Sequence, residues 1–404
     1  MSGVTSLPLP RYLVESAAAD ASPERREWVA ALPEIVAALA ERWSLRLGEP
    51  YRPGGQCSWV ALAVDACGQH LVLKVGWRHS EALHEADALR LWAGDGAALL
   101  HDAHTFGQTS ALLMELCSPG APLKHAVAEP EQDLVVAGLL NRLWREPEAV
   151  HPFRSLQSMC EDWAAEFGAK LAARPDAVDP GLARAGMELF RFLPATADRS
   201  VVLVTDLHAE NILASQREPW LVIDPKPYVG DPAYDSLQHM LNCESRLQAN
   251  PVVLVQRMAE LLPVDPERLR SWLFARCVQE SLDQPHPSLA LPHAIHACTR
   301  CVSDGAAAAR ESDGSAPGRR NGARPGHCPS PCRRASRSRT RSSCHSAGRV
   351  RVNTSLRVLR RGRAWTGGRC EAQSSRPSLV RRGRGRASPL RRRPALSPDW
   401  RGTA

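Results

Sequence analysis

The sequence predicts an α+β protein with two lobes, a small antiparallel sheet followed by a mainly helical lobe, and then a disordered C-terminal tail. Short apolar and β-branched runs separated by turn residues characterise the chain up to residue 116. Apolar residues at intervals of three and four dominate residues 117–285. The helical pattern then fades, and the rest of the chain lacks the apolar content of a core. We therefore expect lobes at 1–116 and 117–285 and a tail at 286–404.

The first lobe is predicted to open with a helix and to continue as an antiparallel meander. Ser22 suits an N-cap and Pro23 the first helical position, and helical spacing continues to about Arg42. A second helix is expected from Ser80 to about Trp92. The strands are expected at Ser44–Leu47, Trp59–Val64, Leu71–Val75 and Ala111–Leu116.

The second lobe is predicted to be helical with a few short strands. Pro119-Gly120 is the best candidate for the lobe boundary. Asp231 is the expected cap, and Pro232 the first residue, of a helix in the middle of this lobe. Further helices are expected near 134–144, 156–171, 182–193, 252–262 and 266–280, and short strands at Ser200–Val204, Asn211–Ala214 and Trp220–Ile223.

Charge is distributed unevenly along the chain. Residues 1–300 carry a net charge of −12 and residues 301–404 a net charge of +20. The acidic body favours a cationic small-molecule ligand over a specific nucleic acid. No apolar run approaches the ~18 residues that span a bilayer, so we expect a cytoplasmic protein without a membrane partner. The cysteines of the body are scattered singly, which indicates reduced thiols.

The tail has an unusual composition. Residues 301–404 contain 25 Arg but no Lys, Ile, Phe, Tyr or Met. Such a sequence is typical of a GC-rich coding region read in the wrong frame, and we favour a frameshift near 285–300, or disorder, over a basic element that contacts nucleic acid. A zinc site could be built from the cysteine pairs of this region, but the low-complexity sequence around them argues against it; these pairs are Cys298 with Cys301 and Cys328 with Cys332.

The most informative stretch begins at Asp206 and continues through Asn211 to Asp224. Phosphoryl transfer needs a carboxylate that orients the acceptor hydroxyl, and oxygen ligands that hold Mg²⁺ against the phosphates. Asp206 follows a predicted strand, while Asn211 and Asp224 begin and end neighbouring strand segments, so their oxygens are expected to meet. A single aspartate could simply cap a turn, but the spaced set favours catalysis.

A second pair of residues is predicted to bind the nucleotide. Lys74 lies in an apolar strand, and Glu85 lies on the apolar face of the helix predicted from Ser80. A carboxylate on an apolar face needs a partner, and a Lys74–Glu85 ion pair would also hold the ammonium against the α- and β-phosphates. A strand lysine turned to water is the alternative.

Two further segments are weaker candidates for nucleotide contacts. Gly54, Gly55 and Ser58 lie between the first two strands, where a loop over the phosphates is expected, although any hairpin uses glycine. Glu115 and Leu116 join the lobes, and their backbone could hydrogen-bond an adenine edge. The alternative, which fits the sequence equally well, is that these two residues form an ordinary connector between the lobes.

These motifs resemble the aminoglycoside phosphotransferase family, and within it the streptomycin kinase and hydroxyurea phosphotransferase branch. The likeness spans about residues 25–285. It is closest in Asp-Leu-His-Ala-Glu-Asn-Ile-Leu-Ala at 206–214, in Arg-Glu-Pro-Trp-Leu-Val-Ile-Asp-Pro-Lys-Pro at 217–227 and in Val-Gly-Asp-Pro-Ala-Tyr-Asp at 229–235. The resemblance implies a bilobal protein-kinase-like fold and ATP-dependent phosphorylation of streptomycin or a related hydroxylated amine or guanidine, which confers resistance.

The resemblance also implies roles for individual residues. Asp206 would be the catalytic base, Asn211 and Asp224 the Mg²⁺ ligands, and Lys74 with Glu85 the nucleotide clamp. The chain departs from the family in two places. Val204-Thr205 precede the base where the family usually has His-Gly, which could shift the loop, and the Arg-rich tail replaces the family's last helices.

Other functions remain open at this point. A kinase of an endogenous amino sugar or of a hydroxyurea-like metabolite is compatible with the same motifs. An inactive kinase-like protein with a basic binding tail is the alternative from another class, and the intact catalytic set argues against it. Glu161, Asp162 and Glu166 could meet a cationic acceptor, but a solvated helix face explains them equally well.

Deletion of residues 301–404 should leave the melting temperature of the protein nearly unchanged. The segment lacks the apolar content to offset a chain entropy of ~1–2 kcal/mol per residue. The deletion should also weaken salt-sensitive, non-specific binding to nucleic acid, because most of the positive charge lies there. Thermal unfolding and a salt titration of nucleic-acid binding test this. Protease protection of the tail in the native protein, or a cooperative loss of stability on deletion, would contradict it.

Overall fold

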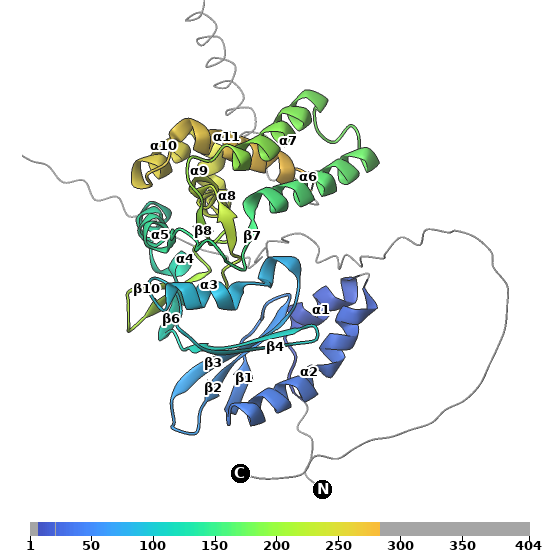
Figure 1. Ribbon diagram of the computed structural model, residues 1–404, viewed down its shortest axis with the longest axis vertical. Coiled ribbons are helices and arrows are strands. Elements are labelled where there is room, and N and C mark those ends of the chain that lie inside the picture. The colour runs from blue at the N-terminus through green and yellow to red at the C-terminus, as the bar shows by residue number, and fades with distance from the viewer. Residues whose placement is uncertain (1–6, 21, 283–404) are drawn as a thin grey trace, which may run out of the picture.

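The computed structural model describes residues 7–20 and 22–282, which form two lobes (Figure 1). A five-stranded antiparallel sheet makes up most of the first lobe, in the order β1-β2-β3-β5-β4. Its strands are β1 (Arg46–Pro50), β2 (Ser58–Val64), β3 (His70–Trp77), β4 (Leu100–Phe106) and β5 (Thr109–Glu115). Its helices are α1 (Arg11–Ala19), α2 (Pro23–Arg42), the 3₁₀ turn η1 (Ser80–Ala82) and α3 (Glu85–Trp92).

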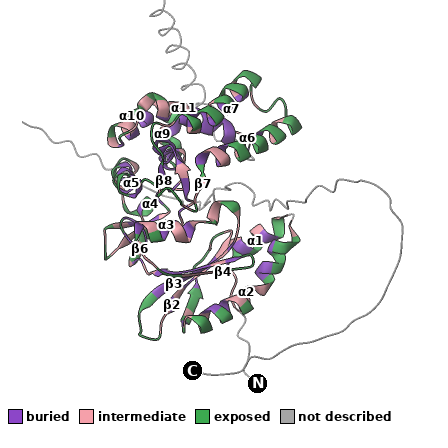
Figure 2. Cartoon of the chain, in the orientation of Figure 1, coloured by how far each residue is buried: buried purple, intermediate pink, exposed green. Residues whose placement is uncertain are grey.

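Both faces of this sheet are covered, because successive side chains of a strand point to opposite faces. Leu71 and Leu73 of β3 belong to a core shared with Leu32 of α2. Val72 of the same strand packs instead against the core that contains Trp92 of α3 and most of the second lobe. Figure 2 marks buried residues along the strands of this sheet. The sheet therefore separates two hydrophobic clusters, and Lys74 lies on the face that is turned to α3 and the second lobe.

The second lobe is mainly helical, as expected. Its helices are α4 (Leu123–Ala126), α5 (Glu129–Leu143), α6 (Leu156–Ala173), α7 (Pro180–Ala195), α8 (Leu237–Asn242), α9 (Glu244–Ala249), α10 (Pro251–Leu261) and α11 (Pro266–Glu280), with a 3₁₀ turn η2 (Pro232–Tyr234). Two small sheets have the orders β10-β9-β6 and β7-β11-β8. Their strands are β6 (Pro119–Pro122), β7 (Arg154–Ser155), β8 (Val201–Leu203), β9 (Ile212–Ser215), β10 (Trp220–Val222) and β11 (Tyr228–Gly230).

The expected antiparallel meander and most of the expected helices are confirmed. The helix predicted from Ser80 differs, because only a 3₁₀ turn forms there and α3 begins at Glu85. Glu85 and Asp87 lie in the first turn of α3, where acidic side chains favour a helix N-terminus. Asp231 accepts a hydrogen bond from the backbone N–H of Ala233 at 3.0 Å, but the turn that it opens is 3₁₀, with α8 following.

Seven elements of the described residues are not predicted by the sequence, namely α1, β4, β6, α4, β7, β11 and α9. α1 lies before the first predicted helix, and β11 is a three-residue strand. β4 lacks apolar alternation, since most of its residues are exposed or half-buried, and it is defined by its pairing with β5. The residue boundaries of the two lobes stay a prediction. The tail and its cysteine pairs lie outside the described residues, within which no helix is long and apolar enough to cross a membrane.

Candidate active site

The loop that carries Asp206 is held by a buried carboxylate. Asp235 accepts hydrogen bonds from the backbone N–H groups of Val204 at 3.0 Å and Thr205 at 2.6 Å, and from the indole N–H of Trp144 at 2.9 Å. Burial raises the pKa of Asp235 to about 6, although these hydrogen bonds lower it. Because the carboxylate fixes two consecutive backbone groups, it determines where Asp206 lies.

Thr205 has a backbone conformation that side chains seldom adopt. Its φ of 53° is in the left-handed region, which is costly for a β-branched residue. The strain is offset by bonds to both of its polar groups, since its hydroxyl donates to the carbonyl oxygen of Lys226 and its N–H donates to Asp235. Glycine would adopt this conformation without strain, and Thr205 is one of the two residues before the base that differ from the expected His-Gly.

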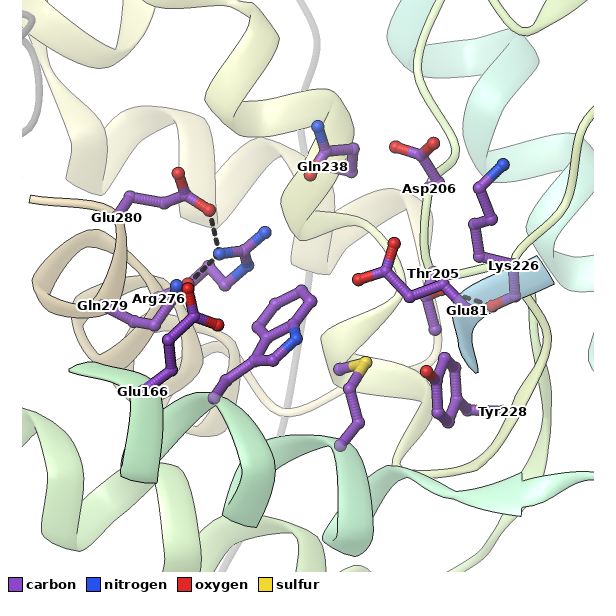
Figure 3. A pocket seen from close by; sticks show the side chains of 12 residues that line it. Glu81, Glu166, Thr205, Asp206, Lys226, Tyr228, Gln238, Arg276, Gln279 and Glu280 are labelled. Carbon is purple, nitrogen blue, oxygen red and sulfur yellow. Dashed lines mark hydrogen bonds and ion pairs between the residues drawn. The ribbon is translucent and has the colours of Figure 1, made fainter. Parts of the chain in front are cut away.

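Asp206 faces a pocket beside Lys226 (Figure 3). Burial raises the pKa of Asp206 to about 7, and the carboxylates of Asp224 and Glu81 add to the rise, while the ammonium of Lys226 opposes it. A carboxyl group with a pKa near neutrality can accept a proton from a hydroxyl group and release it again.

The β9–β10 hairpin places Asn211 beside Ile223, the residue before Asp224, while the expected meeting of the two side-chain oxygens stays a prediction. The backbone N–H of Ile223 donates to the carbonyl oxygen of Asn211 at 2.9 Å. The amide nitrogen of Asn211 donates to the backbone oxygen of Asp206 at 3.1 Å, so its amide oxygen is the atom that can act as a metal ligand. Asp224 has a φ of 53°, which turns the chain sharply at the end of β10.

Asp224 receives two ammonium groups at one oxygen. Lys74 Nζ lies 2.7 Å and Lys226 Nζ 2.6 Å from Asp224 Oδ1. Burial alone would raise the pKa of Asp224, but Lys226 and Lys74 hold it far below its usual range. The carboxylate therefore stays ionised at neutral pH.

The ion pair between Lys74 and Glu85 is present. Lys74 Nζ lies 2.6 Å from Glu85 Oε1 and 2.7 Å from Oε2, and both side chains are almost fully buried. Because Lys74 also reaches Asp224, one ammonium group joins α3 and β3 of the first lobe to the turn that follows β10 in the second.

The loop between β1 and β2 is fixed from its outer side. Gly54 has a φ of 83°, and a Cβ there would lie 2.3 Å from Pro10 Cβ. Arg25 of α2 donates to the carbonyl oxygen of Gln56 at 2.9 Å. Glycine is thus required at position 54 by packing, whatever the loop binds. Contact of Gly54, Gly55 and Ser58 with phosphate stays a prediction.

Glu115 joins the lobes through its side chain. Its carboxylate accepts hydrogen bonds from the guanidinium of Arg217 at 2.6 and 3.0 Å and from the backbone N–H of Leu99 at 2.6 Å. The backbone N–H of Glu115 donates to the carbonyl oxygen of Leu99, so it is not available to a ligand. Neither Leu116 nor Cys117 donates its N–H to a backbone carbonyl of any described residue, which leaves these two for an adenine edge.

The acidic residues of α6 only partly line the pocket. Glu166 lines it but is paired with Lys170 at 2.5 Å. Asp162 is paired with Arg154, and Glu161 accepts a hydrogen bond from Gln157. The pocket also contains residues that the sequence analysis did not single out, namely Glu81, Lys226, Gln238, Arg276 and Glu280. The signal for Lys226 and Asp235 was present, since both lie inside the motifs that carry the family resemblance.

A second polar cluster is buried between α5 and α8. Ligand atoms of Asp133, His239 and Cys243 lie within 4.8 Å of one another. Both oxygens of Asp133 accept from Arg246, at 2.9 and 2.7 Å, and burial raises the pKa of the Cys243 thiol to about 12. A paired carboxylate and a protonated thiol are poor metal ligands, so this cluster is structural.

Comparison with known proteins shows which family this sequence matches. The model of the aminoglycoside/hydroxyurea antibiotic resistance kinase family matches residues 42–283. Streptomycin 6-kinase of Streptomyces griseus is 33% identical over 292 residues, which cover 70% of this chain and 92% of that protein. Hydroxyurea phosphotransferase of Kitasatospora aureofaciens is 34% identical over 280 residues, covering 68% and 79%. The crystal structure of choline kinase LicA from Streptococcus pneumoniae aligns with 67% of this chain and 99% of its own at a TM-score of 0.45 and 13% identity.

Substitution of Asp206 by Asn should stabilise the protein above neutral pH. The pKa of this group is about 7 in the folded protein and ~3.9 in an unfolded chain. Between pH ~3.9 and about 7 the unfolded state therefore binds fewer protons than the folded state. The contribution of Asp206 to the free energy of unfolding falls over this range and is lost once the pH has risen through 7. Asp206→Asn should raise the melting temperature by a few degrees at pH 8 and by less at pH 5. An equal change at both pH values would contradict the raised pKa.

Proposed function

Because the chain belongs to the aminoglycoside/hydroxyurea antibiotic resistance kinase family, we propose that it transfers the γ-phosphoryl group of ATP to a hydroxyl group of streptomycin or a related cationic small molecule, and so confers antibiotic resistance. We place the reaction in the cytoplasm and expect neither a membrane nor a specific nucleic acid as partner. The observation that carries the proposal is the convergence of Lys74 and Lys226 on one oxygen of Asp224, beside the pocket of Asp206.

Each polar group of the site has a role in this reaction. The acceptor oxygen attacks the γ-phosphorus as the bond to the bridging oxygen of ADP breaks, and the hydroxyl proton passes to the Asp206 carboxylate. Lys74, oriented by Glu85, holds the α- and β-phosphates. Lys226 lies close enough to Asp206 and Asp224 for its charge to act on the pKa of both. We therefore propose that its ammonium group stabilises the negative charge of the transferred phosphoryl group.

The side chains of Asp224 and Asn211 suit Mg²⁺. This ion prefers oxygen ligands and is commonly held by one or two carboxylates together with substrate phosphates. Asp224 is ionised and already attracts two cationic groups, and the amide nitrogen of Asn211 is engaged, which directs its oxygen to the role of ligand. Asp224 and Asn211 would hold the ion, whose charge would offset that of the phosphates.

Thr205 supports an active rather than a vestigial site. A residue that had lost its function would not be expected to keep a strained φ of 53° under two hydrogen bonds. Val204-Thr205, in place of the expected His-Gly, is therefore compatible with a correctly placed Asp206. An inactive protein with a basic binding tail is the weaker candidate. Phosphorylation of hydroxyurea is the second candidate, favoured by the 34% identical relative.

An ATPase-coupled assay of the purified full chain tests the function. Streptomycin, hydroxyurea and a small panel of aminoglycosides serve as acceptors, and mass spectrometry of the products identifies the phosphorylated group. We expect acceptor-dependent release of ADP with streptomycin. Absence of turnover with every acceptor, together with normal nucleotide binding, would favour the inactive alternative or a kinase of another metabolite.

Asp206→Asn should retain nucleotide binding and lower turnover by ~10²-fold or more. The substitution removes the carboxylate that receives the hydroxyl proton but leaves the groups that contact the phosphates. Steady-state kinetics and a titration with a fluorescent ATP analogue measure the two effects separately. Unchanged turnover would remove Asp206 from the mechanism.

Asp224→Ala should abolish magnesium-dependent binding of ATP. The substitution removes the carboxylate ligand and leaves only the amide oxygen of Asn211 from the proposed pair. Calorimetric titrations of ATP with and without Mg²⁺ measure this, and circular dichroism checks that the variant is folded. Binding of ATP with the magnesium dependence of the wild-type protein would exclude Asp224 as a ligand.

A further inference from the structure

Glu81 differs from the other acidic residues around the acceptor pocket. It lies in η1, within the connection that joins Lys74 of β3 to Glu85 of α3, so the first lobe supplies it. In Figure 3 the Glu81 side chain lies between Asp206 and Lys226 on one side and Arg276 with Glu280 on the other. The first lobe thus places a carboxylate in a pocket whose other described walls come from the second lobe.

Three of the four carboxylates that line this pocket already face a cation. Glu166 is paired with Lys170, Glu280 with Arg276, and Asp206 lies near Lys226. Glu81 forms no hydrogen bond or ion pair with any residue that the structure describes. A half-buried carboxylate with no partner, directed into a pocket, favours a cationic ligand.

Gln238 gives a second and independent indication of a ligand. Its side chain is 4% exposed and lines the same pocket. Its amide nitrogen is buried and has no hydrogen-bond partner among the described residues. An unpaired buried donor is costly, and an oxygen of a polyhydroxylated ligand would satisfy it. The pocket therefore offers one acceptor of positive charge and one donor to oxygen.

We propose that Glu81 binds the cationic group of the acceptor, so that the pocket selects alcohols that carry a guanidinium or ammonium group over neutral acceptors such as hydroxyurea. This inference rests on the proposed function and names the substrate class for the same site. It also makes the first lobe a direct contributor to acceptor recognition. The segment from β3 to α3 would then contact both substrates, the nucleotide through Lys74 at its start and the acceptor through Glu81 near its middle.

Glu81→Gln tests the proposal, because it keeps the size of the side chain and removes the charge. We expect the KM for streptomycin, and its Kd measured by calorimetry with a non-hydrolysable ATP analogue, to rise ~10-fold or more, because a charge-assisted hydrogen bond is lost. The KM for ATP and the melting temperature should stay unchanged. Glu34→Gln is the matched control, since it removes an exposed charge of the same lobe that lies outside the pocket.

The outcomes separate this inference from the proposed function. Unchanged binding of streptomycin to Glu81→Gln would overturn the role of Glu81, whether or not the enzyme is active. A parallel rise in the KM for ATP would also overturn it, because Glu81 would then serve the nucleotide. Absence of turnover in the wild-type protein would contradict the proposed function, yet the calorimetric comparison would still decide whether Glu81 binds the cation.

Discussion

The buried ammonium group of Lys74 is the constraint on which the arrangement of the two lobes depends. A buried charge is stable only with close partners, and Lys74 has one in its own lobe, Glu85, and one in the second lobe, Asp224. Removal of either partner would leave an uncompensated charge between the sheet and the second lobe. The ion pairs therefore fix α3 against β3 and, at the same time, fix the end of β10 against both.

The sequence was sufficient to predict the Lys74–Glu85 ion pair, but not the further contacts of Lys74 and Asp224. The amphipathic pattern around Glu85 predicts a carboxylate on an apolar helix face that needs a cationic partner, and Lys74 lies in the apolar strand that precedes it; both are local signals. The contact of Lys74 with Asp224 joins residues 150 positions apart. The second ammonium group, that of Lys226, approaches Asp224 because the chain turns through a positive φ at that aspartate. Aspartate tolerates this conformation better than most residues, but the residue type alone does not indicate which aspartate adopts it.

The catalytic loop illustrates the same limit. Asp206 was recognised from its motif, whereas its supports were recognised only in the structure. Asp235 lies 29 residues further along the chain, and its hydrogen bonds to the backbone determine the loop. β4 and α1 were missed for another reason, since their apolar content is low or irregular and their positions are set by neighbours. Glu81 was missed because the helix that was expected to begin at Ser80 begins five residues later.

The two hydrophobic clusters on either side of the sheet have a consequence for local unfolding. Leu112 and Met114 of β5 belong to one cluster, and Ala111 and Leu113 of the same strand to the other. The boundary between the two cores thus runs through the plane of the sheet and not through the cleft between the lobes. Because the backbone amides of β3 and β5 lie between the two cores, we expect these two strands to be the slowest hydrogen-exchanging part of the first lobe. The strand that carries Lys74 should then be the last part of that lobe to lose its structure.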